Sequence, residues 1–231
     1  MSETPSAAAT WKAGLWRRIC TLWPLKAIGN TVFVTVFFHL YFYIQRHPWF
    51  AATPIPVTAI DRWIGFQPAA LWLYLSLWVY TGLPVALQPD LKRLARFGLH
   101  IGLMCALALA VFALWPTSTS MAPDRSQAGG AFAVLRGLDA SGNACPSLHV
   151  AAAVFCGLWL HTLLRRIGTP AWLRALNWLW CLAIVYSTLA TKQHQWIDVV
   201  AGAALGAAGG WLSLRNGTDG DMTPVDRLSS S

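Results

Sequence analysis

Six apolar stretches, each close in length to a membrane span, constrain this chain more than any other feature of its sequence. Of its 231 residues, 56% are hydrophobic and only 11% are charged, whereas soluble domains carry roughly 25% charged residues. A membrane-spanning helix needs about 20 consecutive and mainly apolar residues. The sequence therefore predicts an all-α, polytopic membrane protein with six spans, at residues 27–44, 68–87, 97–115, 148–164, 172–190 and 197–214.

Polar segments beside and between these stretches complete the predicted organisation. Residues 1–26 are predicted to be a cytoplasmic flank, 27–214 a six-span domain, and 215–231 a disordered cytoplasmic tail. Apolar residues recur at helical spacing within 57–64, which is typical of an amphipathic helix lying on the membrane between the first two spans. The longest connection, 116–146, is rich in Ser, Thr, Gly and Pro, and loops of this length are usually functional or disordered.

The placement of the basic residues predicts how the spans are oriented. When six spans alternate in direction, twelve of the 17 Lys and Arg residues fall on one side of the membrane and five on the other. Cytoplasmic segments carry the excess of Lys and Arg, so both termini are predicted to be cytoplasmic, in a membrane of the bacterial inner-membrane kind. The loop at 116–146 then faces the periplasm or exterior. Because this topology accounts for the net charge of +8, nucleic acid is not predicted as a partner.

Two polar motifs stand at span ends on the predicted outer side. The first is Cys-Pro-Ser-Leu-His at 145–149, and the second is Lys-Gln-His-Gln-Trp-Ile-Asp at 192–198. Ser147 is a good helix N-cap, and the free N–H groups at a helix N-terminus bind anions such as phosphate. His194 and Asp198 are four residues apart and are expected to share one face of the sixth span. A carboxylate inside a span is a functional hypothesis by default.

These residue types in this order indicate phosphoryl transfer through histidine. Asp198 can accept a hydrogen bond from one ring nitrogen of His194, which fixes the tautomer and leaves the other nitrogen as a nucleophile. His149, in the first turn of the fourth span, can protonate the leaving oxygen, since an unperturbed histidine has a pKa of about 6.5. The predicted catalytic residues are therefore His194, His149 and Asp198, and the reaction is predicted to need no cofactor and no metal.

At these residues the chain resembles the type 2 phosphatidic acid phosphatase superfamily, which also contains lipid phosphotransferases and the vanadium haloperoxidases. The stretch 146–149 resembles the superfamily's second motif, and Ser187, His194 and Asp198 resemble its third. The wording Pro-Ser-Leu-His followed by Gln-His-x-x-x-Asp is most similar to the branch that includes the inositol phosphorylceramide synthases. The resemblance covers roughly residues 27–214 and agrees with six spans and a long outer loop.

The resemblance implies a role for each motif residue. It implies that His194 is the nucleophile that becomes a phosphohistidine, that His149 is the general acid, and that Asp198 orients His194. It also implies that Ser147 contacts the phosphate. With the predicted spans, it implies an integral membrane lipid phosphatase that acts on a lipid phosphate or diphosphate at the outer face of the bilayer. A lipid head-group phosphotransferase with an alcohol as acceptor is the alternative.

The chain departs from the superfamily at the groups that hold the phosphate. The third motif usually has Arg directly after its Ser, and Thr188 stands at that position. The first motif is a Lys, six further residues and then Arg-Pro. The nearest candidate for its Arg is Arg125, but Ser118 and Ser126 stand where the Lys and the Pro would be. Arg125 and Lys192 are the predicted replacements as substrate-binding residues, although Lys acts on phosphate as a point charge rather than as a bidentate fork.

Three further classes of protein stay open at the level of sequence. His149, His194 and Asp198 could ligate a metal, since two histidines and a carboxylate bind iron or zinc. Ser147 with His194 could belong to an intramembrane serine protease, although no G-x-S-x-G motif is present. A non-enzymatic membrane scaffold would leave Asp198 inside a span without a role. The five cysteines show no spaced framework, so no structural disulfide is predicted.

Overall fold

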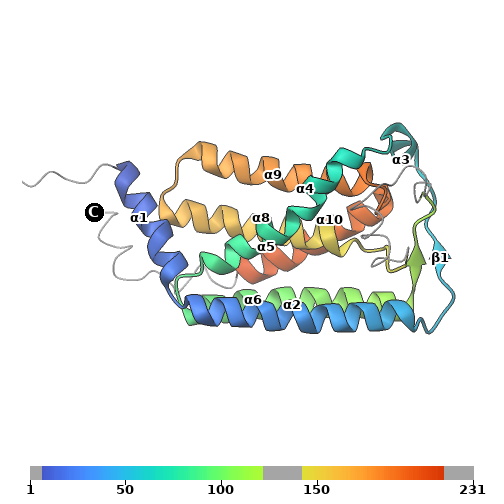
Figure 1. Ribbon diagram of the computed structural model, residues 1–231, viewed down its shortest axis with the longest axis horizontal. Helices are drawn as coiled ribbons and strands as arrows, with labels where there is room; N and C mark the ends of the chain where they lie inside the picture. Colours follow the sequence, from blue (N-terminus) through green and yellow to red (C-terminus); the bar gives the residue numbers. More distant parts are fainter. Residues whose placement is uncertain (1–6, 122–141, 216–231) are drawn as a thin grey trace, which may run out of the picture.

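The computed structural model describes residues 7–121 and 142–215 (Figure 1). Six of its helical segments are long and apolar enough to cross a bilayer, with η1, α4 and α5 together forming one of them. The prediction of an all-α, six-span membrane protein is confirmed, and the short helix α3 lies between the first two spans as expected. The helices are α1 (Ala7–Cys20), α2 (Trp23–Arg46), α3 (Ala59–Trp63), η1 (Pro68–Ala70), α4 (Leu71–Leu75), α5 (Leu77–Ala86), α6 (Leu91–Leu114), α8 (Leu148–Ile167), α9 (Ala171–Ala190) and α10 (Trp196–Arg215).

Helix α8 forms the centre of the bundle, and α2 lies at its edge. Helix α8 contacts α5, α6, α9 and α10, and it is the most buried of the six spans. Helix α2 packs against α5 and α6 and has no buried residue in its most apolar stretch. In Figure 1, α2 and α6 run side by side along one edge of the bundle and α9 runs along the other. The exposed apolar side chains of α2 are those expected of a helix surrounded by lipid.

The second span is interrupted, whereas the sequence predicts one continuous helix at 68–87. Helix α4 ends one residue before Ser76 and α5 begins one residue after it. The hydroxyl of Ser76 donates to the carbonyl oxygen of Leu73 and accepts from the indole N–H of Trp180 at 2.9 Å. The interrupted segment crosses the bundle obliquely, with α4 packed on α9 and α5 packed on α8 and α2 (Figure 1). Such breaks are tolerated inside a membrane because neighbouring helices supply replacement hydrogen bonds.

The third span begins earlier than predicted. The sequence predicts a basic turn at 88–96, but α6 already begins at Leu91. The carboxylate of Asp90 accepts the backbone N–H of Arg93 at 2.8 Å, which is the bond of an N-cap residue. The prediction of a turn was therefore wrong, because the cap outweighs the polarity of the segment. The basic side chains that follow lie on the first turns of a helix at a span end, where long cationic chains reach toward the membrane surface.

Two glycines bring α10 directly against α8. A Cβ atom at Gly202 would stand 2.3 Å from the carbonyl oxygen of Ser147, and one at Gly206 would stand 2.3 Å from that of Ala151. Any side chain at these positions would push the two helices apart, and small residues at this spacing are typical of close helix packing in membranes. The close approach sets the two N-termini side by side, and the N–H of Ser147 donates to the carbonyl oxygen of Asp198 at 3.1 Å.

A small parallel sheet, which the sequence did not predict, joins two connections at the same end of the bundle. Strand β1 (Thr53–Pro54) pairs with β2 (Thr117–Ser118), and Ser118 also bridges to Gly142. We call this end, which carries α3, β1 and the N-termini of α8 and α10, the site end. The opposite end, where α6 begins and α8 and α10 finish, is called the far end. The predicted 116–146 loop therefore lies at the site end wherever its residues are described.

Candidate active site

His194 lies in the turn between α9 and α10. The backbone N–H groups of Gln193 and His194 both donate to the carbonyl oxygen of Thr188 at 3.2 Å. The expectation that His194 shares a helix face with Asp198 was wrong, because α10 begins only at Trp196. The turn nevertheless folds His194 back over the start of α10, and its Nδ1 lies 3.6 Å from Oδ2 of Asp198.

Asp198 is fully buried in the first turn of α10. Its Oδ2 accepts the backbone N–H of Gln195 at 2.8 Å, as acidic side chains in the first turn of a helix often do. Its Oδ1 and the Nδ1 of His194 are both buried without a hydrogen-bond partner among the described residues. The carboxylate oxygen near Nδ1 is Oδ2, so the two side chains are adjacent without a hydrogen bond between them. Hydrogen bonds of catalytic groups are often long in the absence of substrate, and a shift of a few tenths of an ångström would bring Nδ1 of His194 within range of Oδ2 of Asp198.

His149 faces the interrupted second span from the first turn of α8. Its Nε2 lies 3.1 Å from the carbonyl oxygen of Tyr74, and its ring stacks on the Tyr74 ring with centroids 3.8 Å apart. A carbonyl oxygen only accepts, so Nε2 of His149 carries a proton and donates it. This bond fixes the ring and leaves Nδ1 as the nitrogen that can serve a substrate.

Ser147 caps α8, as its sequence context predicts. Its hydroxyl oxygen accepts the backbone N–H of Val150 at 3.3 Å, and its side chain is fully buried. The cap and the bond from the N–H of Ser147 to Asp198 together hold the start of α8 beside the start of α10. The role of Ser147 as a phosphate contact stays a prediction.

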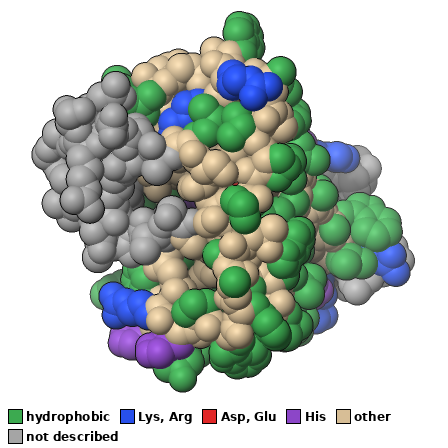
Figure 2. Space-filling model, turned by 90° about the vertical axis from the view of Figure 1, so that its right-hand side faces the viewer, with side chains coloured by type: hydrophobic (Ala, Val, Ile, Leu, Met, Phe, Trp, Pro, Cys, Tyr) green, Lys and Arg blue, Asp and Glu red, His purple; other side chains and the backbone are tan. Residues whose placement is uncertain are grey.

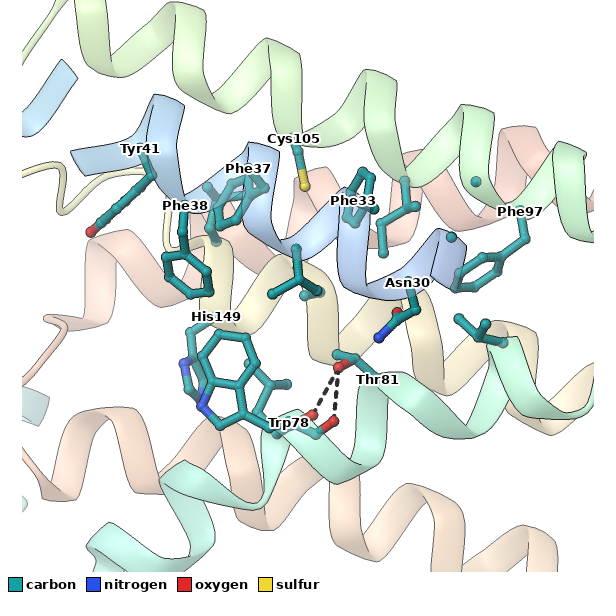
Figure 3. Close-up of a pocket in the computed structure, with 18 of the residues that line it drawn as sticks. Asn30, Phe33, Phe37, Phe38, Tyr41, Trp78, Thr81, Phe97, Cys105 and His149 are labelled. Atoms are coloured by element: carbon teal, nitrogen blue, oxygen red, sulfur yellow. Dashed lines mark hydrogen bonds between the residues drawn. The ribbon is translucent and has the colours of Figure 1, made fainter. Parts of the chain in front are cut away.

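An apolar cavity of about 800 Å³ reaches both histidines. It is lined by α2, the α4–α5 segment, α6 and α8, and in Figure 3 His149 lies toward the left of the view, at the opposite side from Phe97. Its lining on α2 extends from Leu25 to Phe42, which corresponds to about 25 Å along a helix. Aromatic side chains make up much of the wall, including Phe33, Phe37, Phe38, Tyr41 and Trp78.

A sequence profile described as "PAP2 superfamily" matches residues 43–212, which is more than half of the chain and includes both polar motifs. The chain belongs to the PAP2 superfamily. No curated protein and no solved structure matched the chain at a significant level. Membership of the PAP2 superfamily supports a phosphatase-like function on lipid phosphates and agrees with the resemblance that the motifs carry.

Of the two cations predicted to replace the phosphate clamp of the PAP2 superfamily, Lys192 lies among the described residues and Arg125 does not. The ammonium of Lys192 donates to the carbonyl oxygens of Asp61 and Ile64 at the end of α3. Burial lowers the pKa of Lys192 below its usual value, and the charge of Asp61 acts in the opposite direction. An ammonium has three N–H donors, so at most one is left for a phosphate. Arg125 lies outside the described residues.

Asp61, which the sequence did not single out, ties α3 to the turn that carries His194. Its Oδ1 accepts the backbone N–H of Trp196 at 2.7 Å, and its Oδ2 accepts the N–H and the hydroxyl of Thr58 at 2.8 and 2.7 Å. The side chain is only 2% exposed. The pattern Thr-x-x-Asp at 58–61 is the signature of a capping box, so it could have predicted the local bonds but not the bond to Trp196.

Asn143 is a second residue that the sequence reasoning missed. It lines the cavity with His149 and His194, and its side-chain Nδ2 is buried without a hydrogen-bond partner among the described residues. Its backbone has φ 58°, a conformation that asparagine tolerates better than most residues. The only sequence signal is its place two residues before Cys145, in a glycine-containing turn. An amide N–H₂ at this place is a donor available to an anion.

The described surface of the site end carries Lys and Arg side chains but no exposed carboxylate. Figure 2 views this end directly, and Lys and Arg side chains show near its edges while no Asp or Glu side chain is visible among the coloured atoms. The two described carboxylates at this end, Asp61 and Asp198, are buried. A surface of this kind favours the approach of an anionic head group. Among the described residues, no group of three or more His, Cys, Asp or Glu side chains is arranged to hold a metal ion.

Proposed function

We propose that this member of the PAP2 superfamily is an integral membrane lipid phosphatase that hydrolyses a lipid phosphate or diphosphate through a phosphohistidine. The observation that carries the proposal is that His149 and His194 meet at an apolar cavity between membrane spans. A lipid tail lying along α2 would bring its head group against the two imidazoles. Pockets that bind small molecules are mainly apolar and have a few polar groups at the reacting end.

In the first half-reaction, Nε2 of His194 attacks phosphorus. Its Nδ1 carries the proton and donates it to Asp198, so Nε2 keeps its lone pair. As the N–P bond forms, the P–O bond to the lipid breaks. Protonated His149 gives the proton on Nδ1 to the leaving oxygen, while its Nε2–H stays bonded to the carbonyl oxygen of Tyr74. The products are a lipid alcohol and a phosphoryl group on His194.

In the second half-reaction, water attacks the phosphohistidine. Nδ1 of His149, now neutral, takes a proton from the water, whose oxygen bonds to phosphorus as the N–P bond breaks. Inorganic phosphate leaves, and both histidines return to their starting state. If an alcohol takes the place of water, the same step makes the protein a lipid head-group phosphotransferase. The motif wording at 146–149 and 193–198 is the observation that favours this second reading.

The phosphate itself is proposed to be held by hydrogen-bond donors around the start of α8. These are the N-terminal N–H groups of that helix, the hydroxyl of Ser147, and Lys192 and Arg125 as predicted from the sequence. We add the amide of Asn143, because its unpartnered Nδ2 lines the cavity beside both histidines.

The test is a rapid-quench experiment with a lipid phosphate labelled at phosphorus, in detergent and at neutral to alkaline pH. Wild-type protein is expected to carry label on histidine, and His194→Ala to show neither label nor turnover. His149→Ala is expected to lose roughly 10²–10⁴-fold in turnover, least for an activated ester that departs without a proton. His39→Ala, at an exposed position on α2, is the matched control. Turnover of His194→Ala comparable to wild type would eliminate the mechanism.

Asp198→Asn tests the tautomer. Oδ2 both accepts the N–H of Gln195 and lies 3.6 Å from Nδ1 of His194, so an asparagine has to place either its oxygen or its N–H₂ there. With the N–H₂ there, Nδ1 would have to accept, and the proton would move to Nε2 and block the nucleophile; with the oxygen there, the negative charge that stabilises a protonated His194 is lost. The variant is expected to fold and to lose turnover. Adding candidate alcohols to the same quench assay separates hydrolysis from phosphotransfer, since a phosphorylated alcohol forms only in the second case.

A further inference from the structure

At the far end of the bundle, a small cavity of about 20 Å³ lies between the first turns of α6 and the last turns of α8 and α10. It is a separate cavity that shares no lining residue with the large one, although the large cavity also reaches the first turns of α6, at Leu91, Leu94 and Phe97. Its polar lining consists of Arg93, Arg96, Arg166, Trp159, Thr162 and Ser213.

Two donors in this lining have no partner. The indole Nε1 of Trp159 and the hydroxyl of Ser213 are buried without a hydrogen bond among the described residues, and the two side chains are 4% and 0% exposed. Buried polar groups almost always have a partner, so each such group calls for an explanation. The Trp159 ring is packed edge-on against Phe97, with centroids 5.4 Å apart. This packing holds its N–H in place.

We propose that this cavity binds an anionic phosphate group. One phosphate oxygen accepts the N–H of Trp159 and the hydroxyl of Ser213, and the guanidinium groups of Arg96 and Arg166 contact the remaining oxygens at the mouth. The volume suits this arrangement, because a cavity of about 10–15 Å³ already holds one oxygen-sized group. Arg93 takes a smaller part, since it pairs with Asp90 at 3.7 Å.

The position of the cavity favours a lipid as the source of the phosphate. It lies at the ends of three spans, at the level where the head groups of a bilayer lie. Basic pockets between membrane helices bind anionic head groups in this way. A free phosphate ion offers the same oxygens, and a single water molecule could fill the same volume, so the experiment has to separate the three.

The experiment measures binding rather than activity, so its outcome is independent of the proposed chemistry. The full-length protein, purified in detergent, is titrated with phosphatidylglycerol, with phosphatidylcholine and with inorganic phosphate, and the rise in Tm gives an apparent Kd for each. Trp159→Phe and Ser213→Ala each remove one donor while keeping most of the side-chain volume. Trp172→Phe, at an exposed position at the start of α9, is the matched control.

Wild type and Trp172→Phe are expected to be stabilised by phosphatidylglycerol and not by phosphatidylcholine. Trp159→Phe and Ser213→Ala are expected to raise the apparent Kd for phosphatidylglycerol about tenfold, as befits the loss of one hydrogen bond to a charged group. Stabilisation by inorganic phosphate with the same dependence on the two variants would support the site with the free ion as ligand. Equal responses in all variants, or no stabilisation by either anion, would overturn the proposal, and the cavity would hold water only.

Discussion

Replacing Asp61 by asparagine tests whether a residue outside the motifs positions the nucleophile. The carboxylate of Asp61, in α3, accepts the backbone N–H of Trp196, which is two residues after His194. Among the described residues, no other side chain of α3 bonds this N–H. The carboxylate also holds Thr58 through two bonds. Asparagine has the same shape but offers one acceptor oxygen and one N–H₂ donor. In one orientation, the asparagine N–H₂ faces the backbone N–H of Trp196, and in the other it faces the backbone N–H of Thr58. One of the two hydrogen bonds is therefore lost in either case.

The magnitude follows from the bonds that are lost. The bond from Trp196 to Asp61 is short and charge-assisted, and a hydrogen bond to a charged group contributes about 1.5–3 kcal/mol. If the asparagine oxygen keeps the bond from the N–H of Thr58, the bond from Trp196 is lost. The loss then falls at the start of α10, which also carries Asp198. Since each 1.36 kcal/mol corresponds to a factor of ten, kcat/KM is expected to fall by roughly 10- to 100-fold.

The assay is phosphate release from a lipid phosphate in detergent, with Tm measured on the same preparations. Thr58→Val is the matched control, because it removes the hydroxyl bonded to Oδ2 of Asp61 but leaves the bond to Trp196. The control is expected to lower Tm while keeping kcat/KM near that of wild type. A folded Asp61→Asn protein with wild-type kcat/KM would refute the reasoning. An equal loss in Thr58→Val would show that the effect arises from the stability of α3 and not from the His194 turn.

Three further predictions follow from the site end. Asn143→Ala should lower kcat/KM for phosphate release about tenfold or more, because one donor to the phosphate is lost, and Asn143→Asp should lower it further, because a negative charge takes its place. Wild-type values of kcat/KM for both variants would remove Asn143 from the site. In intact cells, an impermeant thiol reagent should label a cysteine at the exposed Ser120 but not the exposed Cys20, and the reverse pattern would invert the predicted topology. Burial and the nearby charge of Asp198 raise the pKa of Cys145 to about 11, so iodoacetamide at neutral pH should modify Cys20 of the purified protein well before Cys145. Equal rates of modification would contradict a buried Cys145 beside a carboxylate.

The spans could be predicted because a bilayer leaves a chain few choices. Every backbone polar group must be satisfied inside the hydrocarbon, so a long apolar stretch becomes a helix almost regardless of its neighbours. The errors fall where side-chain bonds decide the outcome. The cap at Asp90 begins α6 early, and the hydroxyl of Ser76 with the indole of Trp180 marks the break in the second span. Hydropathy carries no information on either bond.

The proximity of the motif residues could be predicted because His194 and Asp198 are close in sequence and His149 lies at a matched span end. The contacts around them could not. Asp61 is 135 residues from Trp196, and Lys192 is 131 residues from the carbonyl it bonds, so neither contact leaves a local pattern. Asn143 lines the cavity only because of where the fold places it, beside both histidines. Physical proximity in the fold, rather than spacing along the chain, reveals these three.

Asp198 shows how a structural and a catalytic role can share one side chain. Its Oδ2 closes the start of α10 by accepting the N–H of Gln195, and this bond alone would explain an acidic residue at that position. A cap of this kind needs only one carboxylate oxygen, and it is favourable when water solvates the second oxygen. Here the side chain is fully buried, and Oδ1 has no partner among the described residues. An unmatched carboxylate oxygen in a membrane span is costly unless something else uses it. The Nδ1 of His194, also without a partner among the described residues, lies 3.6 Å from Oδ2 of this carboxylate. A hydrogen bond between the two side chains when substrate binds would give the buried charge a role beyond that of a cap.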